Sequence, residues 1–185
     1  MRPALRLLLP ILVAALVLPA CRAQSLSWRL VNAQIARRHP DVPQATTADL
    51  AARLGRGEPV VLLDARTPAE YAVSHLRGAR RIDPNASADD IRQMLAGTPD
   101  SAAVVVYCSV GWRSGDLAAR IQEAGRGTSG RGRVENLRGS IFAWANEGRE
   151  VVTGAGDSVA VARLVHPFDS TWGRLLRRDL RAPID

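Results

Sequence analysis

Residues 104–114 read Val-Val-Val-Tyr-Cys-Ser-Val-Gly-Trp-Arg-Ser, and they give the clearest indication of the fold class. Three valines followed by a tyrosine predict a strand that is covered on both faces of a parallel sheet. The polar turn after them leads into a pattern typical of a helix from Ser114 to Ala124, with apolar residues on one side. A strand, a short loop and a helix form the repeating unit of α/β proteins.

The sequence on both sides of this stretch continues the alternation of strands and helices. Gly and Pro residues separate the elements, and Thr47 and Ser87 stand where helix N-caps are expected. We therefore predict an α/β, three-layer fold with a mainly parallel central sheet and helices on both faces. The remaining expected strands cover residues 60–63 and 134–137, and the expected helices cover residues 26–35, 47–54, 68–73, 88–95 and 141–146.

Cys108 directly follows the predicted strand and precedes the predicted helix. Ligands of parallel sheets bind beyond the carboxyl ends of the strands, so a site is expected here. The loop amides and the helix dipole would surround the sulfur with partial positive charge, which lowers a thiol pKa and favours the nucleophilic thiolate. Gly111 permits a tight backbone path, and Arg113 adds a full charge that can bind an oxyanion.

Three motifs follow one another in a fixed order between residues 46 and 153. They are Leu63-Asp64-Ala65-Arg66 with Glu70-Tyr71 and His75-Leu76-Arg77-Gly78-Ala79; Val106-Tyr107-Cys108 with Gly111 and Arg113-Ser114; and Asn136-Leu137-Arg138-Gly139 with Trp144, Gly148 and Val151-Val152. Together they resemble the opening, active-site and closing signatures of rhodanese-like domains. Ser140 stands where that family commonly has a second glycine, and we expect this change to affect a packing turn and not the reactive loop.

This resemblance implies a sulfurtransferase in which Cys108 is the catalytic residue. Cys108 would take a sulfane sulfur from a donor such as thiosulfate, become a persulfide, and pass the sulfur to cyanide or a thiol. Four residues separate Cys108 from Arg113, whereas the phosphatases and arsenate reductases of this fold have five, so a single sulfur fits better than a tetrahedral oxyanion. The expected substrate-binding residues are Ser109, Val110, Gly111, Trp112 and Arg113, with Arg66 helping an anion to approach.

Two other functions use the same features. The chain could be a catalytically weak rhodanese-fold module that binds a protein partner of the cell envelope through Trp112, the arginine-rich segment 125–133 and the N-terminal arm. It could also be a redox module in which Cys108 exchanges with the disulfide of a partner.

Other conspicuous residues receive structural interpretations. We expect His75 to be a hydrogen-bonded structural histidine and Asp64 to order the loops. Glu70 is expected on a helix surface and Tyr71 in the core. The three histidines are too scattered to form a metal site, and no cofactor is expected.

The N-terminus has the pattern of a secretory signal peptide. Two arginines within residues 1–6 precede an uncharged apolar run over residues 7–18. Leu18-Pro19-Ala20-Cys21 resembles a bacterial lipobox, which would make residues 1–20 the signal and Cys21 a lipidated N-terminus; cleavage after Ala23 is the alternative. The expected protein is periplasmic and anchored to a membrane only through Cys21. The further organisation is an arm over residues 21–45, the rhodanese-like domain over 46–153, and an extension over 154–185 that packs on the domain.

The 185 residues are sufficient for one domain, and they carry a net charge of +7 that comes from arginine alone, with no lysine. Removal of the signal would lower the charge to +5. Three of the arginines lie in segment 125–133, so the charge does not indicate nucleic-acid binding, and it suits small anionic donors or lipid head groups. Two cysteines cannot form a disulfide framework if Cys21 is lipidated or removed.

Overall fold

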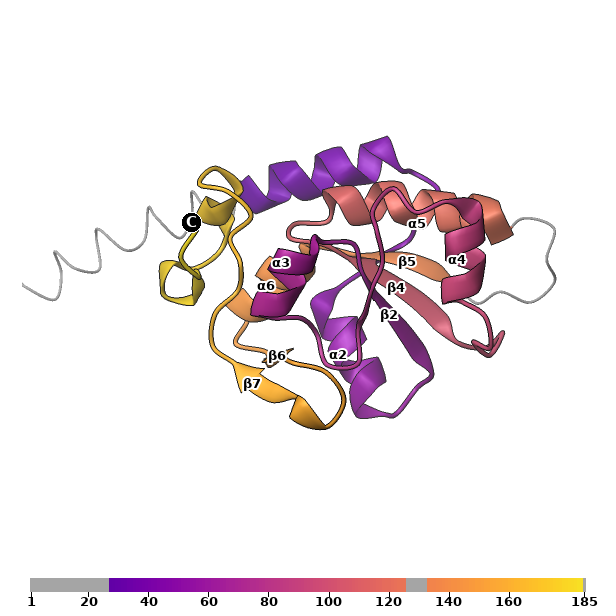
Figure 1. Cartoon of the computed structure of the whole chain (residues 1–185). Coiled ribbons are helices and arrows are strands. Elements are labelled where there is room, and N and C mark those ends of the chain that lie inside the picture. Colours follow the sequence, from indigo (N-terminus) through magenta and orange to yellow (C-terminus); the bar gives the residue numbers. More distant parts are fainter. Residues whose placement is uncertain (1–26, 126–132, 185) are drawn as a thin grey trace, which may run out of the picture.

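A parallel sheet of five strands lies at the centre of the protein (Figure 1). The computed structural model describes residues 27–125 and 133–184. The strands follow the order β1-β5-β4-β2-β3, and every neighbouring pair is parallel. The predicted parallel α/β fold is therefore confirmed. The strands are β1 (Gln44–Ala45), β2 (Val60–Asp64), β3 (Arg80–Arg81), β4 (Ala103–Tyr107) and β5 (Val134–Leu137).

Helices cover both faces of this sheet, and the side chains of β4 accordingly alternate between two buried clusters. Val105 and Tyr107 belong to the cluster that contains residues of α2 and α6. Val104 and Val106 belong to the cluster that contains residues of α4 and α5. The sheet is thus the middle of three layers. The helices are α2 (Thr47–Gly55), α3 (Pro68–Val73), α4 (Ala88–Met94), α5 (Trp112–Gly125) and α6 (Ser140–Asn146).

Two helix starts differ from the prediction. Thr46, and not Thr47, is the N-cap of α2, since its hydroxyl accepts a hydrogen bond from the Asp49 amide. Helix α5 begins at Trp112, two residues before the expected Ser114, because the chain turns at Gly111 with a φ of +112°. The reactive loop is correspondingly shorter than the sequence suggested.

The short strands were not predicted from the sequence. The residues of β1 were not among the expected strands, and neither were those of β6 (Val151–Thr153) and β7 (Ala160–Ala162), which form an antiparallel hairpin. Strands of two or three residues are too short to show an apolar period, so only their backbone partners define them.

Both ends of the described chain pack on the sheet and its helices. A helix over residues 27–38 lies along α5, where Ile35 is buried and Arg38 and His39 contact the carboxylate of Asp116 (Figure 1). The C-terminal extension, residues 154–184, contributes the fully buried Val165 and Leu176 to the cluster on the α2 and α6 side. It also contains three short 3₁₀ helices: η1 (Gly156–Ser158), η2 (Trp172–Leu175) and η3 (Arg178–Leu180).

Several sequence-based predictions concern other parts of the chain. The signal over residues 1–20, its alternative end at Ala23, the lipidated Cys21 and most of segment 125–133 lie outside the described residues. Within residues 27–125 and 133–184, no helix has the length and apolar character needed to cross a membrane.

Candidate active site

Cys108 lies at the carboxyl end of β4, in the loop that joins this strand to α5. Its side chain is buried, and the Gly111 N–H donates to Sγ at 3.2 Å. A Cβ atom at Gly111 would lie 3.3 Å from Cδ1 of Ile35 and would sit on a backbone with positive φ. Glycine is therefore required for the loop to close around the sulfur while the N-terminal helix packs behind it.

The environment of Cys108 favours the thiolate. Burial alone raises the pKa of the Cys108 thiol, but the charge of Arg113 and the backbone N–H groups of Ser114 and Gly111 outweigh it. The pKa of Cys108 consequently lies below its ordinary value. A thiolate is the reactive form of cysteine, so the loop prepares a nucleophile.

Arg113 is held by an ion pair with Glu70. Its Nη1 donates to Oε2 of Glu70 at 2.8 Å, and its Nη2 donates to Oε1 at 2.7 Å. The Ser109 hydroxyl donates to Oε1 and accepts from Nη2, both at 2.9 Å. Burial raises the pKa of Glu70, but the hydrogen bonds and the charge of Arg113 lower it by more, so that the pKa is about 2.

Glu70 was predicted to lie on a helix surface, and this prediction is wrong. Only 2% of its side chain is exposed, because α3 directs this residue inward toward the reactive loop. The same carboxylate closes the capping box of α3 by accepting from the Thr67 amide. Glu70 therefore connects the start of α3 with Arg113 beside the thiol.

Arg66 was expected to help an anion to approach, and its position contradicts this. Its side chain is fully buried and forms a bidentate pair with Asp64, with Nη2–Oδ2 at 2.7 Å and Nε–Oδ1 at 2.9 Å. A further bond from Nη2 reaches the Ser74 carbonyl, and the guanidinium lies over the ring of Tyr107. Arg66 thus joins β2 to the segment after α3 and is not exposed to a substrate.

Ser140 acts on the reactive loop directly, contrary to our expectation of a packing role. Its hydroxyl accepts a hydrogen bond from the Cys108 backbone N–H at 3.1 Å and donates to the Leu137 carbonyl at 3.1 Å. Its φ of +51° lies in the left-handed region, which explains why glycine is common at this position. The strained serine therefore adds a contact that glycine cannot make.

Asn136, in β5, supports the loop from behind. Its Nδ2 donates to the Gly111 carbonyl at 3.0 Å, while its Oδ1 accepts from the Ser114 hydroxyl at 2.7 Å. These bonds fix the peptide that follows Gly111 at the start of α5. Two neighbouring parallel strands, β4 and β5, thus provide the nucleophile and its support.

His75 and Tyr71 have structural positions. The imidazole stacks on the Tyr71 ring with centroids 3.9 Å apart, and its Nδ1 lies 3.1 Å from the Tyr71 carbonyl oxygen. The His75 backbone pairs with Val152 in β6. Tyr71 is only half-buried, and its hydroxyl donates to the Ala79 carbonyl. In the part of the chain that the structure describes, no three His, Cys, Asp or Glu side chains are grouped to hold a metal.

A cavity of about 370 Å³ opens in front of Cys108. The predicted residues Ser109, Val110, Trp112 and Arg113 line it together with the cysteine. Three further lining residues were not assigned to the site from the sequence, because no local pattern places them there: Gln34 of the N-terminal helix, and Phe168 and Trp172 of the C-terminal extension.

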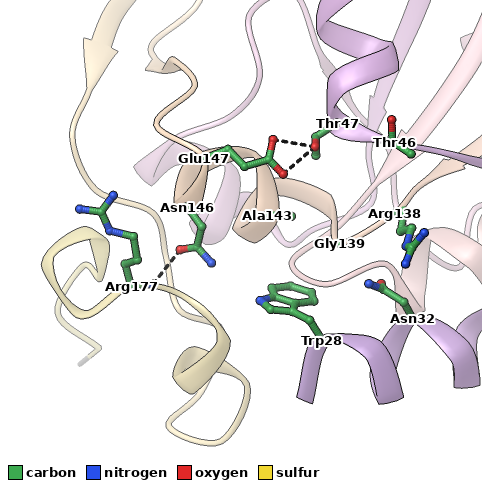
Figure 2. A pocket seen from close by; sticks show the side chains of 10 residues that line it. All are labelled: Trp28, Asn32, Thr46, Thr47, Arg138, Gly139, Ala143, Asn146, Glu147 and Arg177. Atoms are coloured by element: carbon green, nitrogen blue, oxygen red, sulfur yellow. Dashed lines mark hydrogen bonds between the residues drawn. The ribbon is translucent and has the colours of Figure 1, made fainter. Parts of the chain in front are cut away.

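A second cavity, of about 520 Å³, lies between the N-terminal helix, α6 and the C-terminal extension (Figure 2). Trp28 and Asn32 project into it from the helix, and Arg138 points toward Asn32. Trp28 also lies against the turn at Gly139, with Cζ3 3.5 Å from the place of a Cβ atom there. No thiol lines this cavity, so the chemistry of the site belongs to the first one.

Comparisons with known proteins show the family of this chain. The family model for the rhodanese-like domain matches residues 46–147, and the chain belongs to this family. A protein named sulfurtransferase from Allochromatium vinosum is 35% identical over 115 residues, which are 62% of this chain and 99% of that protein. The probable adenylyltransferase/sulfurtransferase MoeZ of Mycobacterium tuberculosis is 31% identical over 102 residues, covering 55% of this chain but only 24% of MoeZ.

Solved structures show the same fold. The BH2092 protein from Bacillus halodurans superposes with a TM-score of 0.50 at 26% identity, covering 64% of this chain and 84% of that one. A thiosulfate sulfurtransferase from Pseudomonas aeruginosa superposes with a TM-score of 0.53 at 20% identity, covering 72% of this chain and 24% of that one. The second likeness concerns the fold alone.

Proposed function

We propose that this protein is a sulfurtransferase that moves a sulfane sulfur through a persulfide on Cys108. The observation that carries the proposal is the buried thiol with a lowered pKa, surrounded by backbone N–H groups at the end of β4. The match to the rhodanese-like family and the relatives named sulfurtransferase support the same reaction class.

The first half-reaction loads the enzyme. The Cys108 thiolate attacks the outer sulfur of a donor such as thiosulfate, a new S–S bond forms, and the bond to the sulfonate breaks. Sulfite leaves with the electron pair of that bond, so no external oxidant is needed. The Gly111 amide, which donates to Cys108 Sγ, and the charge of Arg113 beside it would stabilise the negative charge of the persulfide.

The second half-reaction returns the enzyme to its thiolate form. A nucleophilic acceptor, cyanide or a thiol, attacks the outer sulfur and the persulfide S–S bond breaks. Cys108 is a good leaving group for the reason that makes it a good nucleophile, because a thiol of low pKa accepts the electron pair readily. The same amides and Arg113 thus serve both halves.

Intact-protein mass spectrometry tests the loading step. Incubation with thiosulfate is expected to add the mass of one sulfur atom and to release an equal amount of sulfite. Cys108→Ser is the matched control, since it removes the thiol and retains nearly the same volume, and it should show neither change. Failure of the wild-type protein to load from thiosulfate or any other sulfane donor would contradict the proposal.

We further propose that the chain is exported and anchored through a lipidated Cys21. The charged start, the apolar run over residues 7–18 and the sequence Leu18-Pro19-Ala20-Cys21 support this location. Mass spectrometry of the protein from membranes should find an N-terminus at Cys21 with attached acyl chains. An N-terminus at Gln24, without lipid, would show instead that cleavage follows Ala23.

A further inference from the structure

The cavity in front of Cys108 is closed by residues from outside the family match. Gln34 precedes the matched residues 46–147, and Phe168 and Trp172 follow them. We propose that these three residues select the acceptor of the sulfur, and that this acceptor is a small uncharged thiol with an aryl or alkyl group. This inference rests on the proposed sulfurtransferase function and names the substrate class of the same site.

The size of the cavity favours an organic molecule. A volume of about 370 Å³ lies within the range of ordinary ligand pockets. Cyanide and thiosulfate would fill a small part of it. A thiol with a ring or a short chain can place its sulfur at Cys108 and its apolar group against the walls.

The charge of the cavity favours an uncharged acceptor over an anionic one. Arg113 is the charged residue among those that line it, and Glu70 neutralises Arg113 through two hydrogen bonds. The Phe168 ring covers the same guanidinium, with Cζ of Arg113 4.7 Å from the ring centroid. Arg113 can therefore stabilise the nearby sulfur, but it has little capacity left for a second anionic group.

Aromatic side chains are gathered at this cavity. The chain has only eight aromatic residues of the Phe, Trp and Tyr types, and three of them, Trp112, Phe168 and Trp172, line the wall. Such side chains offer a large apolar surface and prefer to contact other rings at an edge or in an offset stack. An aryl or alkyl group gains from these contacts, whereas a charged group loses water on entering and gains nothing from the apolar rings.

Phe168 is held over the site by an unusual backbone. Its φ is +67°, a region that L side chains rarely adopt, although 40% of the residue is exposed. Its amide donates to Nδ1 of His166, and the next residue, Asp169, accepts from the amides of Thr171 and Trp172 through Oδ1. Strain of this kind is found at ligand clamps, and here it turns the Phe168 ring onto Arg113.

Gln34 is placed by a helix that is fixed at both ends. Trp28 rests on the Gly139 turn at one end (Figure 2), and Arg38 and His39 bind Asp116 at the other. Gln34 therefore contributes a neutral amide to the rim, which can hydrogen-bond to a polar atom of the acceptor without requiring a charge.

The transfer step is balanced without any further reactant. The acceptor thiol attacks the outer sulfur of the Cys108 persulfide anion, one S–S bond forms and one breaks. The acceptor leaves as a persulfide that carries its own proton, and Cys108 is released as a thiolate.

Single-turnover discharge of the preloaded enzyme tests the inference. The acceptors are 2-phenylethanethiol, the charged 2-mercaptoethanesulfonate, and cyanide. Phe168→Ala and Trp172→Ala should each slow discharge to 2-phenylethanethiol about tenfold, because apolar contact area is lost. Discharge to the other two acceptors should change less than about twofold. Leu164→Ala is the control, since Leu164 is a partly exposed apolar residue of the same extension outside the cavity wall. If Trp172→Ala does not fold, Phe168→Ala carries the test.

Alkylation of Cys108 gives a readout that does not need sulfur transfer. Iodoacetanilide, iodoacetamide and iodoacetate carry the same reactive carbon with an aryl group, a small neutral group and a charge. With rates normalised to those of free cysteine, the wild-type protein should react faster with iodoacetanilide than with the other two reagents. In both variants this rate ratio should fall about tenfold. If the protein prefers iodoacetanilide but does not load sulfur, the proposed sulfurtransferase function is contradicted and the apolar binding site beside Cys108 is retained. Equal effects on all reagents and acceptors, or none, would overturn the inference.

Discussion

Two ion pairs between an arginine and a carboxylate lie near the carboxyl ends of the central strands, and they differ in what they can reach. Asp64 and Arg66 are both fully buried, and neither side chain lines the cavity in front of Cys108. In the second pair Glu70 is buried as well, but 23% of the Arg113 side chain is exposed at the cavity beside the thiol. Both pairs join an arginine to a carboxylate. They differ in whether the arginine can be reached from the cavity.

The comparison shows why one arginine stabilises the fold and the other affects the chemistry. The guanidinium of Arg66 donates hydrogen bonds to a carboxylate and a carbonyl of the fold. Arg113 lowers that pKa while Glu70 limits the net charge that a substrate meets. Four experiments test how the two ion pairs and the reactive loop differ.

The largest effect is expected for stability when the buried pair is broken. Asp64→Asn leaves the Arg66 charge buried without its partner, which should lower the free energy of unfolding by about 3–5 kcal/mol. Urea unfolding measures this change. In the control Asp89→Asn, the carboxylate that is lost is 83% exposed and pairs with Arg92, so the change should stay below about 1 kcal/mol. Equal changes in the two variants would show that burial does not set the strength of the pair.

The second effect is the pH dependence that Glu70 contributes. The pKa of Glu70 is about 2 in the folded protein against 4.5 for the free group. The stabilisation is therefore complete above pH 4.5 and is lost as the pH falls toward 2, by up to about 3 kcal/mol. Unfolding free energies of the wild-type protein and Glu70→Gln, measured from pH 7 to pH 2, should converge over this interval. A constant difference between them would mean that Glu70 is not ionised in the pair.

The third effect is on the reactivity of the thiol. Arg113→Gln removes the charge that lowers the pKa of Cys108, so the pKa should rise and alkylation by iodoacetamide at pH 7 should slow by roughly tenfold. The pH profile of alkylation reports the pKa itself. Arg77→Gln, which removes an exposed arginine paired with Glu150, should leave that profile unchanged. An unchanged profile in Arg113→Gln would remove the functional difference between the two ion pairs.

The fourth effect concerns the neutral contact that holds the same loop, and it depends on a difference of only about 1 kcal/mol between two variants. Ser140→Ala leaves the Cys108 amide without its acceptor and should destabilise the protein by about 1–3 kcal/mol. Ser140→Gly loses the same bond but relieves the positive φ, so it should be about 1 kcal/mol more stable than Ser140→Ala. Thermal unfolding of both variants measures the difference. Equal stability of the two would show that the left-handed backbone at Ser140 carries no strain.

Much of the fold could be predicted from the sequence because its signals are local. The apolar runs of β2, β4 and β5 and the capping residue Ser87 set those elements within one or two residues of where they lie. The short strands β1 and β3 were not predicted, because two residues show no apolar period. These strands are defined only by their pairing with neighbours in the sheet.

The candidate site also contains residues that could be predicted from the sequence and residues that could not. Cys108, Gly111 and Arg113 lie within six consecutive residues after one strand, so sequence alone placed them together. Glu70 was predicted wrongly, because a helix of six residues shows too little periodicity to reveal which of its side chains face inward. Arg66 lies before this helix, and its burial and its bond to the Ser74 carbonyl depend on packing that the local sequence does not show. Ser140 was judged by its usual packing role, and only the structure shows its hydroxyl against the Cys108 amide.

Local sequence was sufficient to predict the class of fold, the candidate nucleophile Cys108 and the short loop that lowers its pKa, since these depend on neighbours along the chain. The carboxylate that pairs with Arg113 and the side chains that close the cavity are known only from the way distant segments pack. Gln34 and Phe168 lie more than fifty residues from Cys108 in opposite directions along the chain. Their meeting depends on how the N-terminal helix and the C-terminal extension pack on the sheet, and such packing leaves no local pattern in the sequence.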